Sequence, residues 1–409
     1  MTRTASSLQT EFAGLTLKNP FLLASGPPTR DAGMLDRAFA AGWAGAVVKT
    51  IPSEGLMQRG LTEEPRPLLA PYVVEKRRIG MGNLSITGEW RIEEWAEALP
   101  ELKEQYSDRV VLGSLGAELI QDDWQTMAGQ IAAAGFDGIE LDLSCTHAKL
   151  GRHTPLIVGE DPELVARVVG WVTDVVDIPV IPKFPATVRD WQGVLQACRE
   201  AGAAGVTSIN TLSALMGVDL ESMEPQPSLR GRSTYCGYSG PGIKPIALRV
   251  VSQIDKVGLL PVSGVGGIGT WQDAAEFVLL GARCVQVCTA VMWSGYKIVK
   301  TMIAGLVNYL EQKGVSSLDK LIGEANKRVI DSVFDMEPDH SLVASVTEKC
   351  TNCGRCVTSC WDGGHQAIIT PGDKHPIVNE DVCAGCGLCV QVCPVGAIKL
   401  GPRWSPDGP

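Results

Sequence analysis

The chain has 409 residues, of which 45% are hydrophobic and 20% charged, and its formal net charge is −10. This length is typical of two or three domains, and the acidic balance argues against a nucleic-acid partner. No apolar run approaches the ~20 residues that a membrane helix needs, and the first residues lack the apolar segment of a secretory signal. We therefore expect a cytoplasmic protein without membrane contact, in a reducing compartment where thiols persist.

Eight short apolar runs with the composition of strands recur between residues 20 and 290. Gly, Pro or Asn bound them, and most are continuously apolar, as in strands that are covered on both faces. The runs are 20–24, 46–49, 110–115, 138–143, 179–183, 205–209, 260–263 and 283–287.

Stretches with helical spacing separate these runs. Residues 161–176 begin with an Asp-Pro cap signal, and residues 191–203 and 271–281 end near glycines, which are common where helices stop. Eight alternations of strand and helix predict a (β/α)8 TIM barrel over residues 1–310. A doubly wound sheet is the alternative, but no G-x-G-x-x-G motif follows an early strand.

Two segments do not fit a simple repeat of strand and helix. Residues 50–109 are long for one such unit, and we expect them to fold over the barrel mouth, where loops often have functions. Residues 296–335 have amphipathic helical spacing. They predict a helical linker over 311–340, followed by a small domain over 341–402.

The C-terminal region contains eight cysteines in two runs that both read C-x2-C-x2-C-x3-C. This is the spacing of bacterial two-cluster ferredoxins, in which the fourth cysteine of each run binds the cluster of the other run. Zinc sites use cysteine pairs with longer gaps, and disulfides are disfavoured in a reducing compartment. We therefore predict two [4Fe–4S] clusters in an α+β ferredoxin-like domain. One has the ligands Cys350, Cys353, Cys356 and Cys393, and the other has Cys383, Cys386, Cys389 and Cys360.

The active site of such a barrel lies at the carboxyl ends of its strands. Gly266-Gly267 follows the seventh strand and Cys288-Thr289 follows the eighth, where barrels commonly bind phosphate. Lys183 ends the fifth strand, and it is either part of an interior ion pair or a cation that stabilises a reduced flavin. Because clusters transfer single electrons and substrates usually take two, a phosphate-binding barrel beside clusters predicts FMN.

Cys145 follows the fourth strand in a loop rich in polar residues. A free thiol has a pKa of ~8.5, so it is mostly protonated near neutral pH and can give up a proton. An inert buried cysteine is the alternative, as expected for Cys198 and Cys284. Its place after a strand end favours a catalytic acid.

These motifs resemble those of the flavin subunit of dihydropyrimidine dehydrogenase. That family joins a dihydroorotate-dehydrogenase-like FMN barrel to a two-cluster ferredoxin domain, and the resemblance extends over almost the whole chain. Its most specific stretches are Leu143-Ser-Cys145-x-His147 with Asp161-Pro-Glu-Leu-Val, Asn210-Thr-x-Ser-x-Leu-Met-Gly217, Tyr238-Ser-Gly-x-x-Ile-Lys-Pro-Ile-Ala-Leu-Arg249, and Cys353-Gly-x-Cys356 through Asp362-x-Gly364-x-Gln-Ala-Ile368.

The resemblance implies reduction of the C5=C6 bond of uracil or thymine to the 5,6-dihydro form. A hydride would come from N5 of FMN and a proton from Cys145, and electrons would pass through both clusters from a partner subunit with FAD and NAD(P)H. A homodimer or heterotetramer is the implied assembly. The family pattern assigns FMN contacts to Ala24, Ser25, Lys49, Thr50, Asn83, Asp142, Lys183, Ser239, Gly240, Gly266, Gly267, Cys288 and Thr289. It assigns substrate contacts to Asn83, Ser85, Asp142, Ser144, Asn210 and Thr211.

Two positions depart from the family pattern. The family's N-x-E is here Asn83-Leu-Ser85, and its N-L-S-C is here Asp142-Leu-Ser-Cys145. An ionised Asp only accepts hydrogen bonds, whereas Asn also donates, so the accepted ring is expected to change. A different cyclic unsaturated amide is therefore an alternative substrate. Oxidation of a dihydroorotate-like carboxylate and electron transfer without catalysis are the other two functions to test.

Overall fold

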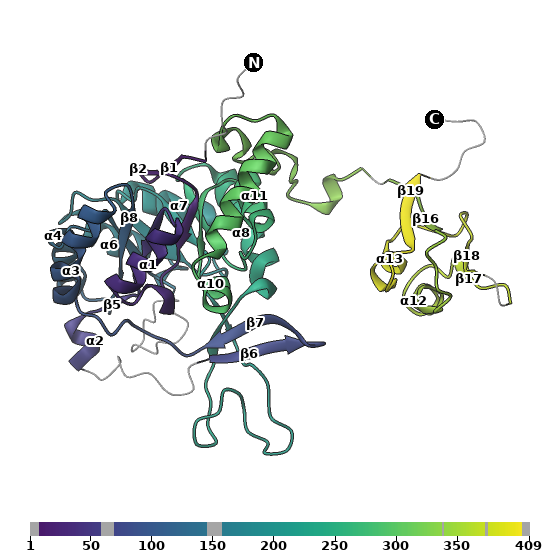
Figure 1. Cartoon of the computed structure of the whole chain (residues 1–409), viewed down its shortest axis with the longest axis horizontal. Coiled ribbons are helices and arrows are strands. Elements are labelled where there is room, and N and C mark those ends of the chain that lie inside the picture. Colours follow the sequence, from purple (N-terminus) through teal and green to yellow (C-terminus); the bar gives the residue numbers. More distant parts are fainter. Residues whose placement is uncertain (1–7, 59–68, 145–157, 338, 373–374, 403–409) are drawn as a thin grey trace. The chain divides into compact units, whose positions relative to one another are not determined.

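The computed structural model describes residues 8–58, 69–144, 158–337, 339–372 and 375–402 (Figure 1). The chain divides between Val329 and Ile330 into two compact units. The larger unit alternates strands and helices, and the smaller one contains both cysteine runs. In the described parts of the chain we find no helix whose length and hydrophobicity would let it span a bilayer.

Eight parallel strands of the larger unit form a closed barrel. They are β3 (Phe21–Leu23), β4 (Gly45–Val47), β8 (Val110–Gly116), β9 (Gly138–Asp142), β10 (Val180–Phe184), β11 (Val206–Ser208), β14 (Val262–Val265) and β15 (Ala282–Val287). Neighbours pair in the order β4-β3-β15-β14-β11-β10-β9-β8, and β8 also pairs with β4, which closes the ring. The predicted (β/α)8 barrel is confirmed.

Helices cover the outside of the barrel (Figure 1). They are α1 (Ala32–Ala41), α3 (Ile92–Gln105), α4 (Gln121–Ala133), α6 (Pro162–Thr173), α7 (Trp191–Glu200), α8 (Lys244–Val257), α9 (Trp271–Leu279) and α11 (Ile298–Lys313). Side chains cap several of them. Asp161 accepts hydrogen bonds from two backbone N–H groups of α6, and Thr270 accepts one from α9. These bonds satisfy N–H groups that the first helical turn leaves without partners.

The core lies mainly between the barrel strands and the helices. The inward face of α6, for example, buries Val165, Val168 and Val172 completely. A second cluster lies inside the barrel, where a hairpin of β1 (Thr10–Phe12) and β2 (Leu15–Leu17) packs against Leu112 and Ile181. Apolar side chains therefore fill this end of the barrel. The polar residues at the carboxyl ends of the strands lie at the opposite end, the mouth of the barrel.

A four-stranded antiparallel sheet lies over that mouth. Its strands, in spatial order, are β12 (Leu212–Ala214), β13 (Cys236–Ser239), β7 (Arg77–Asn83) and β6 (Leu69–Val74). β6 and β7 belong to the insertion 50–109, which also contains β5 (Ile51–Pro52) and α2 (Glu54–Gln58). Pairing places Asn83 opposite Gly237, so this sheet brings two distant chain segments to one edge of the site.

The segment between barrel and C-terminal unit differs from the expected helical linker over 311–340. Gly314, with a φ of 68°, ends α11, because left-handed backbone terminates helices. Short 3-10 helices follow, namely η3 (Leu318–Leu321), η4 (Asn326–Arg328) and η5 (Val333–Asp335). Leu318 and Leu321 join the barrel core. Residues 311–329 therefore pack with the barrel, and no single helix forms the connection among the described residues.

The smaller unit has an α+β fold. β16 (Leu342–Val346) pairs antiparallel with β19 (Ile398–Pro402), and β17 (Ile368–Ile369) pairs with β18 (Ile377–Val378). Helices α12 (Arg355–Gly363) and α13 (Leu388–Val392) lie against each other. Each helix follows a glycine with left-handed backbone, Gly354 or Gly387, so the two cysteine runs have matching local structures.

Candidate active site

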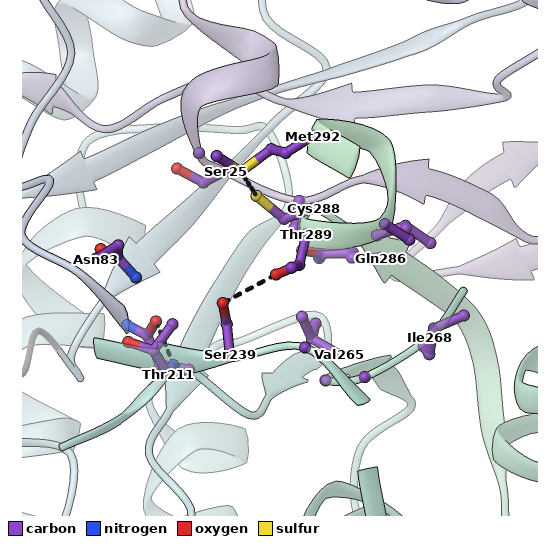
Figure 2. Close-up of a pocket in the computed structure, with 18 of the residues that line it drawn as sticks. Ser25, Asn83, Thr211, Ser239, Val265, Ile268, Gln286, Cys288, Thr289 and Met292 are labelled. Carbon is purple, nitrogen blue, oxygen red and sulfur yellow. Dashed lines mark hydrogen bonds between the residues drawn. The ribbon is translucent and has the colours of Figure 1, made fainter. Parts of the chain in front are cut away.

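A cavity of about 400 Å³ lies at the carboxyl ends of the barrel strands (Figure 2). This volume is typical of small-molecule and cofactor sites. All predicted cofactor contacts line it: Ala24, Ser25, Lys49, Thr50, Asn83, Asp142, Lys183, Ser239, Gly240, Gly266, Gly267, Cys288 and Thr289. Of the predicted substrate contacts, Ser85, Asn210 and Thr211 also line it, whereas Ser144 is fully buried behind the wall. Cys145 lies outside the described residues.

The backbone forms one part of the cavity wall. Gly266 and Gly267 follow β14 with φ values of 129° and 77°, which favour glycine. A Cβ on Gly267 would lie 2.9 Å from the backbone N of Lys244. Nearby, Thr289 in α10 (Thr289–Ser294) donates a hydrogen bond to Ser239, with 2.9 Å between the two Oγ atoms (Figure 2). Such glycine turns let backbone N–H groups approach phosphate oxygens.

Lys183 is held by a buried network at the base of the cavity. Its Nζ lies 3.0 Å from Glu140 Oε1, and Glu140 Oε2 accepts a hydrogen bond from Gln286 at 2.8 Å. All three residues line the cavity, so Lys183 belongs to an interior ion pair and also forms part of the cavity wall. Gln286 Oε1 is buried and has no hydrogen-bond partner among the described residues. A donor group on a bound cofactor would satisfy that oxygen.

Lys49 and Thr50 follow β4 and extend the polar wall. Lys49 Nζ donates to the Ile86 carbonyl at 3.0 Å, and Thr50 Oγ1 lies 3.0 Å from Ser114 Oγ. Burial raises the pKa of the Cys288 thiol to about 11, although Lys49 and Lys183 oppose this shift. Cys288 therefore stays a neutral thiol near neutral pH, which fits a wall residue better than a nucleophile.

Amide and hydroxyl groups gather at another part of the cavity. Asn83 Nδ2 donates to the Gly237 carbonyl at 2.8 Å. Asn210 Nδ2 donates to Asp142 Oδ1 at 3.2 Å, and Asn210 Oδ1 accepts from the Thr211 backbone N–H at 2.8 Å. Figure 2 shows Asn83 and Thr211 across the cavity from Ile268. A flat ring with ring nitrogens and carbonyls could meet partners of both kinds here.

Sequence reasoning missed several residues of this site. Glu140 and Gln286 are polar residues in the middle of the predicted strands GIELDL and RCVQV, and this interior position was the available signal. Lys244 and Asp273 also line the cavity, with 2.6 Å between Nζ and Oδ1. Lys244 belongs to the quoted stretch Tyr238–Arg249, but nothing in the sequence indicated its pairing with Asp273, because the pair joins the starts of α8 and α9.

The cysteines of the smaller unit surround two small cavities. Cys350, Cys353, Cys356 and Cys393 line one of them, and Cys360, Cys383, Cys386 and Cys389 line the other. Each cavity thus gathers three cysteines of one run and the fourth of the other, which is the arrangement of two-cluster ferredoxins.

Backbone N–H groups point at the sulfur atoms. The Ala367 N lies 3.3 Å from Cys360 Sγ, and the Ala397 N lies 3.1 Å from Cys393 Sγ. Ile368 and Ile398, the residues that follow, are buried in the apolar cluster around these cysteines. Hydrogen bonds to sulfur and exclusion of water are two of the factors that set cluster reduction potentials. The donor set and its surroundings therefore fit iron–sulfur clusters.

Residues 7–310 match the dihydroorotate dehydrogenase family, and residues 344–400 match the 4Fe-4S dicluster domain. The chain therefore belongs to the dihydroorotate dehydrogenase family, in a form that has an added ferredoxin domain, and it is an oxidoreductase. The two matches imply iron–sulfur and flavin cofactors.

The chain is 38% identical to the NAD-dependent dihydropyrimidine dehydrogenase subunit PreA of Escherichia coli (strain K12) over 403 residues, which are 96% of this chain and 95% of the relative. The chloroplastic dihydropyrimidine dehydrogenase (NADP(+)) of Arabidopsis thaliana is 32% identical over 320 residues, 76% of this chain and 75% of the relative. The catalytic subunit of dihydroorotate dehydrogenase B (NAD(+)) of Pyrococcus furiosus is 37% identical over 325 residues, 78% of this chain and 99% of the relative. The resemblance to the dihydropyrimidine dehydrogenase flavin subunit is confirmed.

Proposed function

We propose that the chain reduces the C5=C6 bond of a pyrimidine-like ring to the 5,6-dihydro form, with FMN in the barrel cavity and two [4Fe–4S] clusters in the smaller unit. The observation that supports this best is the composition of the cavity. It combines a glycine turn at Gly266-Gly267, the cations Lys49 and Lys183, and a polar wall that includes Asn83. These are the partners that a phosphate, an anionic ring system and a ring amide need.

Each part of the wall has its own role in this proposal. Gly266, Gly267 and Thr289 would hold the phosphate of FMN, and Lys49 and Lys183 would lie by its ring system. Bound FMN supplies the link between one-electron carriers and a two-electron reduction. Ser85, Ser144, Asn210 and Thr211 would contact or support the substrate ring, together with Asn83 and Asp142.

Cys145 would donate the proton. Reduction of a C=C bond adds one hydride equivalent and one proton to adjacent carbons, so an acid is needed beside the ring. Ser144, the preceding residue, is fully buried next to Asp142 and Asn210. Asp142, three residues before Cys145, is part of the cavity wall.

Electrons would come from a partner subunit with FAD and NAD(P)H. The sequence has no dinucleotide-binding motif after an early strand, and the similar E. coli protein is described as NAD-dependent and as a subunit. Reduction of the clusters by NADH or NADPH only when such a subunit is present would support this role. A homodimer or heterotetramer remains the proposed assembly.

Oxidation of a dihydroorotate-like carboxylate is the second candidate function. The family match over residues 7–310 and the likeness to dihydroorotate dehydrogenase B favour it. In that reaction Cys145 would act as a base, and orotate would be the product. Product analysis with dihydroorotate and with orotate distinguishes the two directions.

The proposed activity predicts that the protein reduces a pyrimidine ring under anaerobic conditions. Protein loaded with iron and FMN is incubated with a chemical reductant and with uracil, thymine, their amino analogues or orotate, and products are separated by chromatography. We expect a 5,6-dihydro product from at least one pyrimidine ring. Absence of any reduced ring from fully loaded protein would contradict the proposal.

The glycine turn predicts a specific loss of FMN. Gly267→Ala introduces a Cβ at a left-handed φ, 2.9 Å from the Lys244 backbone N, so the turn must move. We expect FMN affinity to fall on the order of tenfold or more, measured by reconstitution of the flavin-free protein. Gly295→Ala is the matched control, because Gly295 has the same φ of 77° but no neighbouring atom within 4 Å of its Cβ position. Equal FMN affinity in both variants would argue against a phosphate at this turn.

A further inference from the structure

We propose that Asp142 selects the substrate ring, and that the ring edge facing it is a hydrogen-bond donor, as in an amino-substituted pyrimidine, rather than a carbonyl. This inference rests on the proposed function and narrows its substrate class. Asp142 ends β9 and lines the cavity. Its surroundings determine what it can offer to a ligand.

The carboxylate is fixed through one oxygen. Asp142 Oδ1 accepts three hydrogen bonds: from the Ser144 backbone N at 3.1 Å, from Ser144 Oγ at 3.1 Å and from Asn210 Nδ2 at 3.2 Å. Asp142 Oδ2 accepts no hydrogen bond from the described residues. An ionised carboxylate has no donor, so Oδ2 presents an acceptor and nothing else.

The Asn210 amide has a defined orientation beside Asp142. Its Oδ1 faces the Thr211 backbone N–H at 2.8 Å, and a backbone N–H can only donate, so the amide orientation is determined. Its Nδ2 is then directed at two protein oxygens, Asp142 Oδ1 and, at 2.9 Å, Ser144 Oγ. Around Asp142 the wall therefore presents the acceptors Asp142 Oδ2 and Asn210 Oδ1, while Ser144 and Asn210 direct donors at Asp142 Oδ1.

Asp142 also differs from the other carboxylates of the cavity wall. Glu140 is paired with Lys183, and Asp273 with Lys244. Among the described residues, no lysine, arginine or histidine pairs with Asp142. A ligand N–H or amino group would provide the donor that this carboxylate lacks, whereas a ring carbonyl would bring two acceptors together without a hydrogen.

The Asp142→Asn substitution tests this with little change in shape. The new amide can keep Oδ1 in its place, where it still accepts from Ser144 and Asn210, and its Nδ2 then replaces the acceptor Oδ2 by a donor. Binding is measured by calorimetry on the flavin- and iron-loaded protein. The probes are uracil, cytosine and isocytosine, because the last two have an amino group in place of one or the other carbonyl of uracil.

We expect at least one amino-substituted ring to bind the unaltered protein more tightly than uracil, on the order of 10- to 100-fold. Asp142→Asn should remove or reverse that preference. Asp174→Asn, at the exposed end of α6, is the matched control and should leave it unchanged. A ranking of the three rings that Asp142→Asn leaves unchanged would overturn the inference.

Turnover is measured separately on the same preparations, so that the two proposals can fail independently. If Asp142→Asn changes the binding preference but no ring is reduced, the inference about Asp142 stands and the proposed reduction is wrong. If a ring is reduced and the preference does not respond, the reduction stands and the role of Asp142 is overturned.

Discussion

Cys145→Ala should lower ring reduction by about 10²- to 10⁴-fold, the range typical of a positioned general acid. Alanine has no exchangeable proton, so the carbon beside the hydride acceptor would have to take its proton from water. FMN content and the rate of flavin reduction by a chemical donor should remain as in the unaltered protein, because neither depends on the thiol. Anaerobic single-turnover kinetics separates flavin reduction from ring reduction.

The control for this variant is Cys198→Ala. Cys198 is buried in α7, and burial raises the pKa of its thiol well above the ordinary value, so it is a packing residue. We expect it to keep its ring-reduction rate. Cys145→Ser should retain more activity than alanine, since a hydroxyl still carries a proton. Unchanged turnover of Cys145→Ala would show that another group is the acid.

Loss of Cys360 should remove the cluster bound mainly by the second cysteine run. The cavity lined by Cys360 contains Cys383, Cys386 and Cys389, and no other cysteine of the first run. Cys360→Ala should therefore reduce iron from about eight to about four atoms per chain. Electron transfer from the partner subunit should stop, because the route through both clusters is interrupted, whereas ring reduction with a chemical donor to the flavin should continue.

Pairs of substitutions test the crossed arrangement directly. Cys360→Ala combined with Cys383→Ala removes two ligands of one cluster, so about four iron atoms should remain. Cys360→Ala combined with Cys356→Ala removes a ligand from each cluster, so nearly all iron should be lost. Iron analysis and electron paramagnetic resonance of the reduced protein distinguish these results. Retention of a whole cluster in the second pair would mean that each run binds its own cluster.

Local patterns predicted much of this protein. Barrel strands such as 138–143 could be recognised because parallel strands buried on both faces are continuously apolar, and helix starts such as Asp161 because side-chain caps are local. The crossed arrangement of the cysteine ligands could also be predicted from the sequence, since it depends on spacing within short runs. The linker was the main exception. Helical periodicity continues past Gly314, but the chain there packs Leu318 and Leu321 into the barrel, which the local pattern does not show.

The site itself shows where sequence alone stops. Its strand-end residues could be predicted because the topology of a barrel brings all carboxyl ends to one mouth. The sequence also showed that an aspartate, Asp142, stands where the family has asparagine. Only the tertiary structure showed that Asn210 and Ser144 donate to one carboxylate oxygen of Asp142, and that no residue of the described part of the chain donates to the other. The same holds for Glu140 beside Lys183. Asn210 and Lys183 come from other strands than the carboxylates that they contact. Spacing along the chain therefore does not determine the distances between these groups.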